Sequence, residues 1–332
     1  MRKVNVGIIG LGRFGKNYLK TLSTIKNARV TAVCSRHEET LKGAGILKNK
    51  GIKATTDYRK ILDDGQIDAI VIATPPKTHF TMAREAFLNG KHVLVEKPVT
   101  LTSAGCRELI KISGRRRRIF MAGHLHRYNP GIQQIKKDID DGKLGSVNFA
   151  HCLHLGNGSI RNDVSALWDF LPHSLSIFNY LFGRVPISVN ATGSSSARSN
   201  NEDAVSVSLN YGKSKYASAF ASWLYPFKQM KISISGDKSY AIFDDYRKKD
   251  KLRYYRKTAH SGKPASENYG YISPKISPEK PLTSQLNHFI RCILENKRPF
   301  TDGNEALRVI STLECAQRSM GNGGKAIKIK SA

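Results

Sequence analysis

A glycine-rich segment close to the N-terminus limits the possible folds more than any other feature. Residues 10–15 read Gly-Leu-Gly-Arg-Phe-Gly, directly after the apolar run Val4–Ile9 and at the start of the helical pattern Phe14–Thr24. In that position the three glycines allow a tight turn, close approach of the backbone to a pyrophosphate, and close packing of helix on strand. The first N–H groups of the helix then face the phosphates. The segment therefore predicts a dinucleotide site that includes Gly10, Gly12, Arg13, Phe14 and Gly15.

Short apolar runs alternate with helical patterns through the first 124 residues. The expected strands are Val4–Ile9, Arg29–Cys34, Ile67–Ala73, His92–Val95 and Ile119–Ala122. The expected helices are Phe14–Thr24, Glu38–Lys48, Tyr58–Leu62, His79–Asn89 and Ser103–Ile112. Strands that are apolar on both faces and separated by helices belong to parallel sheets. We therefore expect an α/β Rossmann domain, a doubly wound parallel sheet, over residues 1–124.

The pattern changes after residue 124, where strand patterns follow one another without helices between them. They are Ile187–Gly193, Ala204–Leu209, Tyr216–Trp223, Lys231–Ser235 and Tyr240–Phe243. Residues 247–281 are predicted as a long surface loop, followed by helices at 283–296 and 304–320 and a last strand at 326–330. Consecutive strands indicate a mostly antiparallel open sheet. Residues 125–332 are thus predicted to form an α+β domain for substrate binding and oligomerisation, with a C-terminal segment that packs back toward the Rossmann domain.

The end of the second strand indicates which dinucleotide is bound. Ser35 and Arg36 stand where an enzyme selective for NAD usually carries an acidic residue that binds the ribose hydroxyls. A serine beside an arginine suits a 2′-phosphate instead, so the sequence favours NADP. Glu38 and Glu39 lie close enough along the chain to keep NAD open.

The net charge is strongly positive, with 54 Lys and Arg against 26 Asp and Glu, a formal +28. Such a charge favours anionic partners, but no nucleic-acid-binding motif accompanies it, and the one dense block, Arg115–Arg118, is predicted to be a solvated helix end. Five cysteines without a CxxC pair fit a reducing compartment. No stretch is apolar enough to span a bilayer. We expect a cytoplasmic protein with no membrane partner and no specific nucleic-acid partner.

Several further motifs occur together in a recognisable order. They are Ala-Thr-Pro-Pro-Lys-Thr-His at 73–79, Glu-Lys-Pro at 96–98, Gly-His at 123–124, Arg-Tyr-Asn-Pro at 127–130, Trp168-Asp169 with His173, Gly-Asp-Lys-Ser-Tyr at 236–240 and Pro-Phe-Thr-Asp-Gly at 299–303. Together they resemble the glucose–fructose oxidoreductase/inositol dehydrogenase family (Gfo/Idh/MocA) from residue 4 to the final strand. The resemblance implies an NAD(P)-dependent dehydrogenase or reductase acting on a CH–OH group.

The resemblance also implies residue roles. Lys97 and His173 correspond to the lysine and histidine that flank the reacting carbinol, with Asp169 as the partner of the histidine. Thr74, Pro75, His79, Glu96 and Lys97 fall in the cofactor-binding motifs, and His124, Arg127, Tyr128, Arg161 and Trp168 are candidates for substrate contact. Structural roles stay open for His124 and Arg127, and Asp169 and His173 could instead cap a helix. The histidine pairs 124/126 and 151/154 have no carboxylate or thiolate at a useful spacing, so no metal is expected.

The substrate is expected to be a sugar, and a nucleotide sugar is favoured. Asp163-Val164, residues 222–228 and Phe243-Asp244-Asp245 are similar to family members that oxidise UDP-N-acetylglucosamine or its uronic acid at C3 for surface polysaccharide. Arg161, Lys228 and residues 247–257 are candidate phosphate contacts. A free polyol or deoxysugar, a keto-sugar reductase and a non-catalytic dinucleotide-binding regulator stay open. The resemblance further implies a homodimer or homotetramer that pairs through the second domain's sheet.

Overall fold

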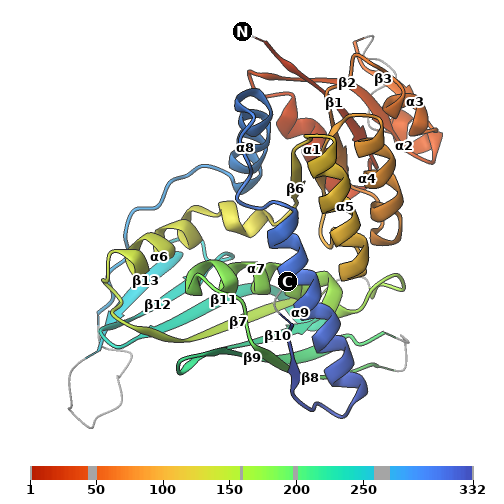
Figure 1. The fold of residues 1–332 in the computed structure, drawn as a ribbon. Helices are drawn as coiled ribbons and strands as arrows, with labels where there is room; N and C mark the ends of the chain where they lie inside the picture. The colour runs from red at the N-terminus through yellow and green to blue at the C-terminus, as the bar shows by residue number, and fades with distance from the viewer. Residues whose placement is uncertain (1, 44–50, 158–159, 197–200, 258–269, 331–332) are drawn as a thin grey trace. The chain divides into compact units, whose positions relative to one another are not determined.

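The computed structural model describes residues 2–43, 51–157, 160–196, 201–257 and 270–330. The chain divides into two compact units (Figure 1). Unit 1 comprises Met1–Leu125 and Glu279–Ile310, and unit 2 comprises His126–Pro278 and Ser311–Ala332. Helix α9 (Gly303–Gly321) contributes its first half to unit 1 and its second half to unit 2.

Unit 1 is built on a six-stranded sheet in the order β3-β2-β1-β4-β5-β6, and every pair of neighbours is parallel. The strands are β1 (Val4–Ile9), β2 (Ala28–Cys34), β3 (Lys53–Thr55), β4 (Ala69–Ile72), β5 (His92–Val95) and β6 (Phe120–Ala122). The strand order reverses between β1 and β4, and ligands of doubly wound sheets bind at the carboxyl ends of strands at such a point. The sequence-predicted Rossmann fold is confirmed.

The helices of unit 1 include five that follow strands in turn. They are α1 (Arg13–Leu22), α2 (Glu38–Gly43), α3 (Arg59–Leu62), α4 (His79–Leu88) and α5 (Ser103–Arg115), with a 3₁₀ turn η2 at Pro76–Thr78. The last part of the predicted helix Glu38–Lys48 lies outside the described residues. A late helix, α8 (Pro281–Glu295), packs against α1 and β1 and buries Leu286 and Phe289. Unit 1 is therefore completed by a segment far along the chain.

Unit 2 contains an eight-stranded mixed sheet in the order β13-β12-β11-β7-β10-β9-β8-β14. Its strands are β7 (Val147–Asn157), β8 (Ser188–Ser194), β9 (Ala204–Gly212), β10 (Lys215–Ser222), β11 (Leu224–Gly236), β12 (Ser239–Asp244), β13 (Leu252–Arg256) and β14 (Ile327–Lys328). Only β7 and β10 pair in parallel among these described strands; the other neighbours are antiparallel. The expected mostly antiparallel sheet is confirmed.

Helices α6 (Pro130–Asp140) and α7 (Ala166–Phe182) lie on one face of this sheet (Figure 1). Helix α7 continues through Pro172, although a proline removes one helical hydrogen bond. It ends at Gly183, whose φ of 65° lies in the left-handed region that glycine adopts without strain. On β10, Ala217, Ala219 and Ala221 are buried while Tyr216 and Phe220 are exposed, so the sheet has one covered face and one open face.

Two parts of unit 2 differ from the sequence expectation. Strand β13 lies within the segment predicted as a loop, where it pairs with β12 and where Tyr254 also forms a bridge to Ile272. Strand β11 begins at Leu224 instead of Lys231, and its pairing with β7 shifts register between Leu224 and Gln229. Tyr and Arg dominate the edge strand β13, and the first five residues of β11 are all exposed, so neither segment shows an apolar alternation. Among the described residues, no helix has the length and apolarity needed to cross a bilayer.

Candidate functional site

The loop between β1 and α1 has the geometry that a dinucleotide requires. Gly10 has a φ of 97°, and a Cβ there would lie 2.6 Å from the Ala73 carbonyl oxygen. A Cβ on Gly15 would lie 1.9 Å from the Gly10 carbonyl oxygen, so the helix packs directly on the loop. In contrast, a Cβ on Gly12 would meet no atom within 4 Å. Gly12 is also the N-cap of α1, so open space adjoins the first N–H groups of the helix, which fits a pyrophosphate.

Ser35 and Arg36 lie beside this loop because the Gly10 N–H donates to the Cys34 carbonyl at 2.9 Å. Ser35 is buried at the end of β2, whereas Arg36 is exposed and donates from Nε to His37. A cavity of about 290 Å³ next to them is lined by Glu38 and Thr55, among others. Glu38 forms an ion pair with Lys42 at 3.7 Å. The residues predicted to contact the ribose thus include side chains of both charges.

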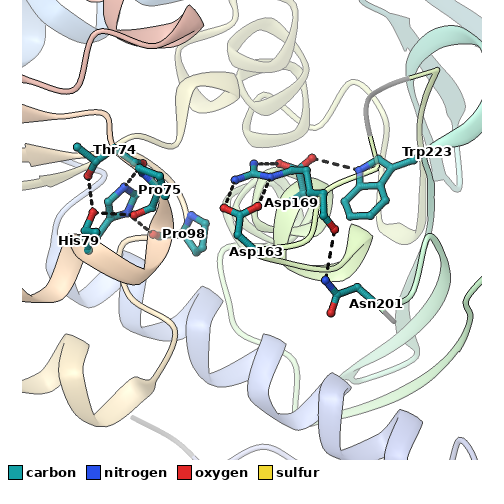
Figure 2. Close-up of polar contacts among 10 residues, drawn as sticks. Thr74, Pro75, His79, Pro98, Asp163, Asp169, Asn201 and Trp223 are labelled. Atoms are coloured by element: carbon teal, nitrogen blue, oxygen red, sulfur yellow. Dashed lines mark hydrogen bonds and ion pairs between the residues drawn. The ribbon is translucent and has the colours of Figure 1, made fainter. Parts of the chain in front are cut away.

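His79 joins the loops that follow β4 and β5 (Figure 2). The buried ring contacts the Thr74 carbonyl through Nε2 at 2.7 Å and the Pro98 carbonyl through Nδ1 at 2.8 Å. A neutral imidazole has one N–H and can donate to only one of the two carbonyls, whereas the imidazolium satisfies both. Thr74 Oγ1 also lies 2.7 Å from Thr78 Oγ1. His79 therefore fixes the two loops that carry the other predicted cofactor residues.

Glu96 is buried directly before Lys97 and accepts hydrogen bonds from Tyr18 Oη and from the Lys97 N–H, the latter at 3.0 Å. Burial raises the pKa of Glu96 above its usual range, against the opposing effect of Tyr18 and Lys97. These contacts fix the Lys97 backbone at the carboxyl end of β5. His124, also in unit 1, forms a buried pair with Glu305, which supports the structural role left open for it.

Asp169, in the first turn of α7, is held from two sides (Figure 2). Arg161 Nη1 donates to Asp169 Oδ1 at 3.1 Å, and Trp223 Nε1 donates to Asp169 Oδ2 at 3.2 Å. The same guanidinium binds both oxygens of Asp163, at 2.9 and 2.6 Å, and this hydrogen bonding lowers the pKa of Asp163. The predicted residues Arg161 and Asp169 are thus brought together, and both carboxylates are stabilised as anions.

His173 lies one turn further along α7 and is 8% exposed. Its ring packs edge-on against His126, with centroids 4.5 Å apart, and lies 5.8 Å from the ring of His154. His154 in turn stacks on Phe170 at 4.3 Å. The described residues include no group of three His, Cys, Asp or Glu side chains that could hold a metal ion. The rings of His126 and His154 therefore pack around His173.

Three further predicted residues of unit 2 contact other elements of the same unit, and two of them, Arg127 and Tyr128, are buried. The Arg127 guanidinium lies 4.0 Å from the centroid of the Tyr180 ring, and Tyr128 is 2% exposed. Trp168 Nε1 donates to Gln317 on α9 at 3.2 Å. These contacts support positioning roles for Arg127, Tyr128 and Trp168.

Sequence reasoning assigned no role to three side chains of this region. Trp223 contacts Asp169 from the end of β10, and His126 and His154 contact His173 from the 3₁₀ turn η3 (Leu125–Tyr128) and from β7. Each is distant in sequence from its partner. Only the excess of histidine around residues 124–154 could have indicated the ring cluster.

The parallel sheet and the glycine loop define a dinucleotide-binding protein of the Rossmann class. Comparison with known families agrees: residues 4–124 match the "Oxidoreductase family, NAD-binding Rossmann fold" model of Gfo/Idh/MocA proteins, and residues 132–242 match the GFO/IDH/MocA C-terminal domain. The chain belongs to the Gfo/Idh/MocA family.

Individual relatives act on different sugars and polyols. An inositol 2-dehydrogenase of Saccharopolyspora erythraea is 29% identical over 57% of this chain and 56% of its own length, so this chain matches little more than half of that relative. A D-apiose dehydrogenase of Paraburkholderia graminis is 25% identical over 100% of this chain and 91% of its own. The structure of a UDP-N-acetylglucosamine 3-dehydrogenase from Acidithiobacillus ferrooxidans has a TM-score of 0.83 at 22% identity, over 98% of this chain and 100% of that chain.

Proposed function

We propose that the protein oxidises a secondary alcohol of a sugar with NAD(P), that the sugar is nucleotide-linked, and that Lys97, His173 and Asp169 carry the chemistry. The observation that most supports this is the ordered surrounding of His173. Its ring is enclosed by His126 and His154, and Asp169 one turn away is held by Arg161 and Trp223.

The chemistry needs a proton acceptor and a stabilising cation. A dinucleotide held by the glycine loop would supply the acceptor for the hydride of the carbinol carbon. His173 takes the hydroxyl proton, because histidine is the side chain that most often acts as a general base. The Lys97 ammonium stabilises the developing alkoxide. Asp169, one turn before His173 on α7, is the proposed partner of the histidine once the proton has been transferred. In the reverse direction the same groups return the proton to the ketone oxygen, so a reductase uses the same residues.

For the cofactor we propose NADP before NAD. Arg36 supplies an exposed guanidinium next to the glycine loop, and Ser35 puts no carboxylate at the end of β2. The Glu38 carboxylate is partly offset by Lys42. The family description names NAD, so a selective NAD enzyme is the second candidate.

For the substrate we propose a UDP-sugar, as in the relative that oxidises UDP-N-acetylglucosamine. The exposed rings of Tyr225 and Phe227 lie with centroids 6.4 Å apart and are followed by exposed Lys228. Rings can stack on a sugar or base, and a lysine can bind phosphate. Arg161 is engaged by two carboxylates, so in this proposal it positions Asp169 and Lys228 contacts phosphate. The inositol and apiose dehydrogenases support a free sugar as the second candidate.

For the assembly we propose a homodimer or homotetramer that forms on the open face of the unit 2 sheet. Phe149, Tyr216, Phe220 and Tyr240 are each between 37% and 40% exposed there, and Phe149 stacks on Tyr216 at 5.9 Å. An aromatic face of this kind favours association. Phe220→Glu is expected to shift the sedimentation coefficient to that of a monomer, whereas Leu88→Glu in unit 1 is expected to have no effect.

The reaction is tested by absorbance at 340 nm with NADP and NAD in parallel, across UDP-sugars, free polyols and deoxysugars. Turnover of a UDP-sugar that His173→Ala abolishes is the expected result. His151→Ala serves as the matched control because His151 lies on the open face of the sheet, where it contacts Ser218. Turnover of a free sugar alone would overturn the nucleotide-sugar assignment. Dinucleotide binding without any turnover would instead favour a regulator.

A further inference from the structure

A cavity of about 440 Å³ opens in unit 2 at the β13 edge of the sheet. Its lining comes from α6, the turns α6–β7 and β11–β12, β13 and residues 272–274, whereas the His173 cluster is formed by η3, α7 and β7. The volume falls within the range of about 300–1,000 Å³ typical of small-molecule pockets. Neither the proposed chemistry nor the cofactor loop uses this cavity.

The lining is strongly basic. Lys143, Lys238, Arg256 and Lys257 contribute four positive charges, and Asp138 is the one acidic lining residue, so the formal charge is 4 − 1 = +3. Ile272 and Pro274 supply an apolar wall. Cations brought together in a partly enclosed space repel one another unless an anion lies between them.

The Asp138 carboxylate is already satisfied from within the protein. It is 3% exposed and accepts from Tyr254 Oη at 2.6 Å, Lys143 Nζ at 2.7 Å and Gln134 Nε2 at 3.0 and 3.1 Å. Burial acts against ionisation, but the hydrogen bonds from Lys143, Tyr254 and Gln134 lower the pKa of Asp138. Asp138 therefore offsets Lys143 and leaves three cations to balance.

Two of these three cations have no acidic partner. Within the described ranges, neither Lys238 nor Arg256 forms an ion pair with a carboxylate. Among the described contacts, Lys257 Nζ lies 3.2 Å from the Ser235 hydroxyl and 4.5 Å from the Tyr240 ring, which places its ammonium toward the open face of the sheet. Within the described residues, no carboxylate therefore balances the charges of Lys238 and Arg256.

The basic segments are held together by the backbone. The Lys238 N–H donates to the Leu144 carbonyl at 3.1 Å, the Lys257 N–H donates to the Lys238 carbonyl at 3.0 Å, and the Ser239 hydroxyl donates to the Lys143 carbonyl at 3.2 Å. The cations consequently need no rearrangement of the chain to converge on a ligand, which lowers the entropic cost of binding.

We propose that this cavity is a second anion site, which binds a small organic phosphate outside the catalytic centre. Lys238 and the Arg256 guanidinium bind the phosphate oxygens, since arginine pairs with them in a bidentate manner and lysine acts as a point charge. The apolar wall of Ile272 and Pro274 contacts the organic part of the ligand. Arg256 belongs to the segment 247–257 that the sequence suggests for substrate phosphate; in this proposal it serves the second site, and Lys228 serves the substrate.

Calorimetric titration of the full chain with pyrophosphate, in the presence of saturating dinucleotide to occupy the glycine loop, tests the proposal. Lys238→Glu/Arg256→Glu is expected to weaken pyrophosphate binding by about tenfold or more. The control Lys325→Glu/Lys330→Glu changes the net charge equally at exposed positions near the C-terminus and is expected to bind as wild type does.

Equal weakening in both variants would show that only the net charge matters and would overturn the site. Citrate binding as tightly as pyrophosphate would overturn the phosphate assignment. Lys238→Gln/Arg256→Gln, which keeps the side-chain length close, repeats the comparison should the double glutamate fail to fold. Dinucleotide affinity is measured in each variant and is expected to stay unchanged, which separates this site from the cofactor loop.

Discussion

The ring of His126 lies edge-on against the ring of His173, with centroids 4.5 Å apart and an angle of 81° between the ring planes. His154, stacked on Phe170, limits the space on another side of His173. A base must point a ring nitrogen at one hydroxyl, and small misplacements of a catalytic group reduce rates strongly. We infer that the neighbouring rings orient His173.

Replacement of His126 tests this orienting role. His126→Phe keeps a flat ring against His173 and is expected to retain most of kcat. His126→Ala removes this contact with the His173 ring and is expected to lower kcat about tenfold or more. The measurement is steady-state kinetics with dinucleotide binding as the control. An equal loss of kcat in both variants would instead assign His126 a chemical role of its own.

Alanine substitutions at two glycines of the loop are expected to have different effects. Gly15→Ala places a Cβ 1.9 Å from the Gly10 carbonyl oxygen, so it is expected to lower the thermal stability and disrupt the loop. Gly12→Ala adds a Cβ in open space, so the fold is expected to be unchanged while dinucleotide binding weakens, because the methyl group occupies the pyrophosphate approach. Thermal unfolding and fluorescence titration with NADPH and NADH distinguish the two effects. Normal binding by Gly12→Ala would contradict the assignment.

Ser35 and Arg36 are expected to set the choice of cofactor. Ser35→Asp with Arg36→Ala places a carboxylate at the end of β2 and removes the guanidinium, so the ratio of NADP to NAD affinity is expected to fall by about tenfold or more. Arg29→Ala, on the exposed side of the same strand, is the control. An unchanged ratio of NADP to NAD affinity would show that another residue determines the choice of cofactor.

Trp223 and Trp168 form a matched pair for testing the support of Asp169. Trp223→Phe removes the N–H that binds the partly buried Asp169 carboxylate. Loss of a donor to a charged acceptor is expected to lower the free energy of unfolding by about 1–3 kcal/mol. Trp168→Phe removes a bond to the neutral amide of Gln317 and is expected to cost less. Urea unfolding followed by circular dichroism gives the free energies. A lower kcat is expected for Trp223→Phe, and an unchanged kcat in this variant would count against the role of Asp169.

His92 is expected to make stability depend on pH. The Ile119 N–H donates to His92 Nδ1 at 3.0 Å, and burial together with Arg118 lowers the pKa of His92 to about 4. Because the ring stays neutral in the folded protein but titrates at about 6.5 when unfolded, the unfolded state gains protons first as the pH falls. The free energy of unfolding should therefore fall by about 2–3 kcal/mol between about pH 7 and about pH 4. His92→Gln, which cannot titrate, is expected to show a correspondingly smaller decrease.

Much of unit 1 could be predicted because its signals are local. The glycine loop, the apolar strands and the turns after β4 and β5 are each set by neighbouring residues, and all the predicted strands of the Rossmann sheet are present. The small strand β3 was missed because Lys53–Thr55 is too short to show a pattern.

In unit 2 the sequence indicates the site residues but not the side chains that contact them. Arg161 and Asp169 were singled out, but the sequence could not show that Trp223 completes the group, because 54 residues separate Trp223 from Asp169. Likewise, His126 and His154 come to His173 through the packing of η3 and β7 on α7. The sequence predicts a loop over residues 247–281 and phosphate contacts at 247–257, but it indicates neither the edge strand β13 nor the cavity beside Tyr254. Such contacts depend on tertiary packing, which pattern and spacing do not encode.

The position of α8 in unit 1 also governs how the chain can acquire its structure. During synthesis β1 and α1 emerge first, yet the helix that covers them, Pro281–Glu295, follows more than half of the chain later. Contacts between residues so far apart in the sequence form slowly. Until they form, the uncovered apolar surface favours association with other chains. A fragment ending at residue 125 would expose the surface that Leu286 and Phe289 bury, so the dinucleotide-binding unit is not expected to be separable by a single cut. Unit 1 is therefore complete only after α8 has been synthesised.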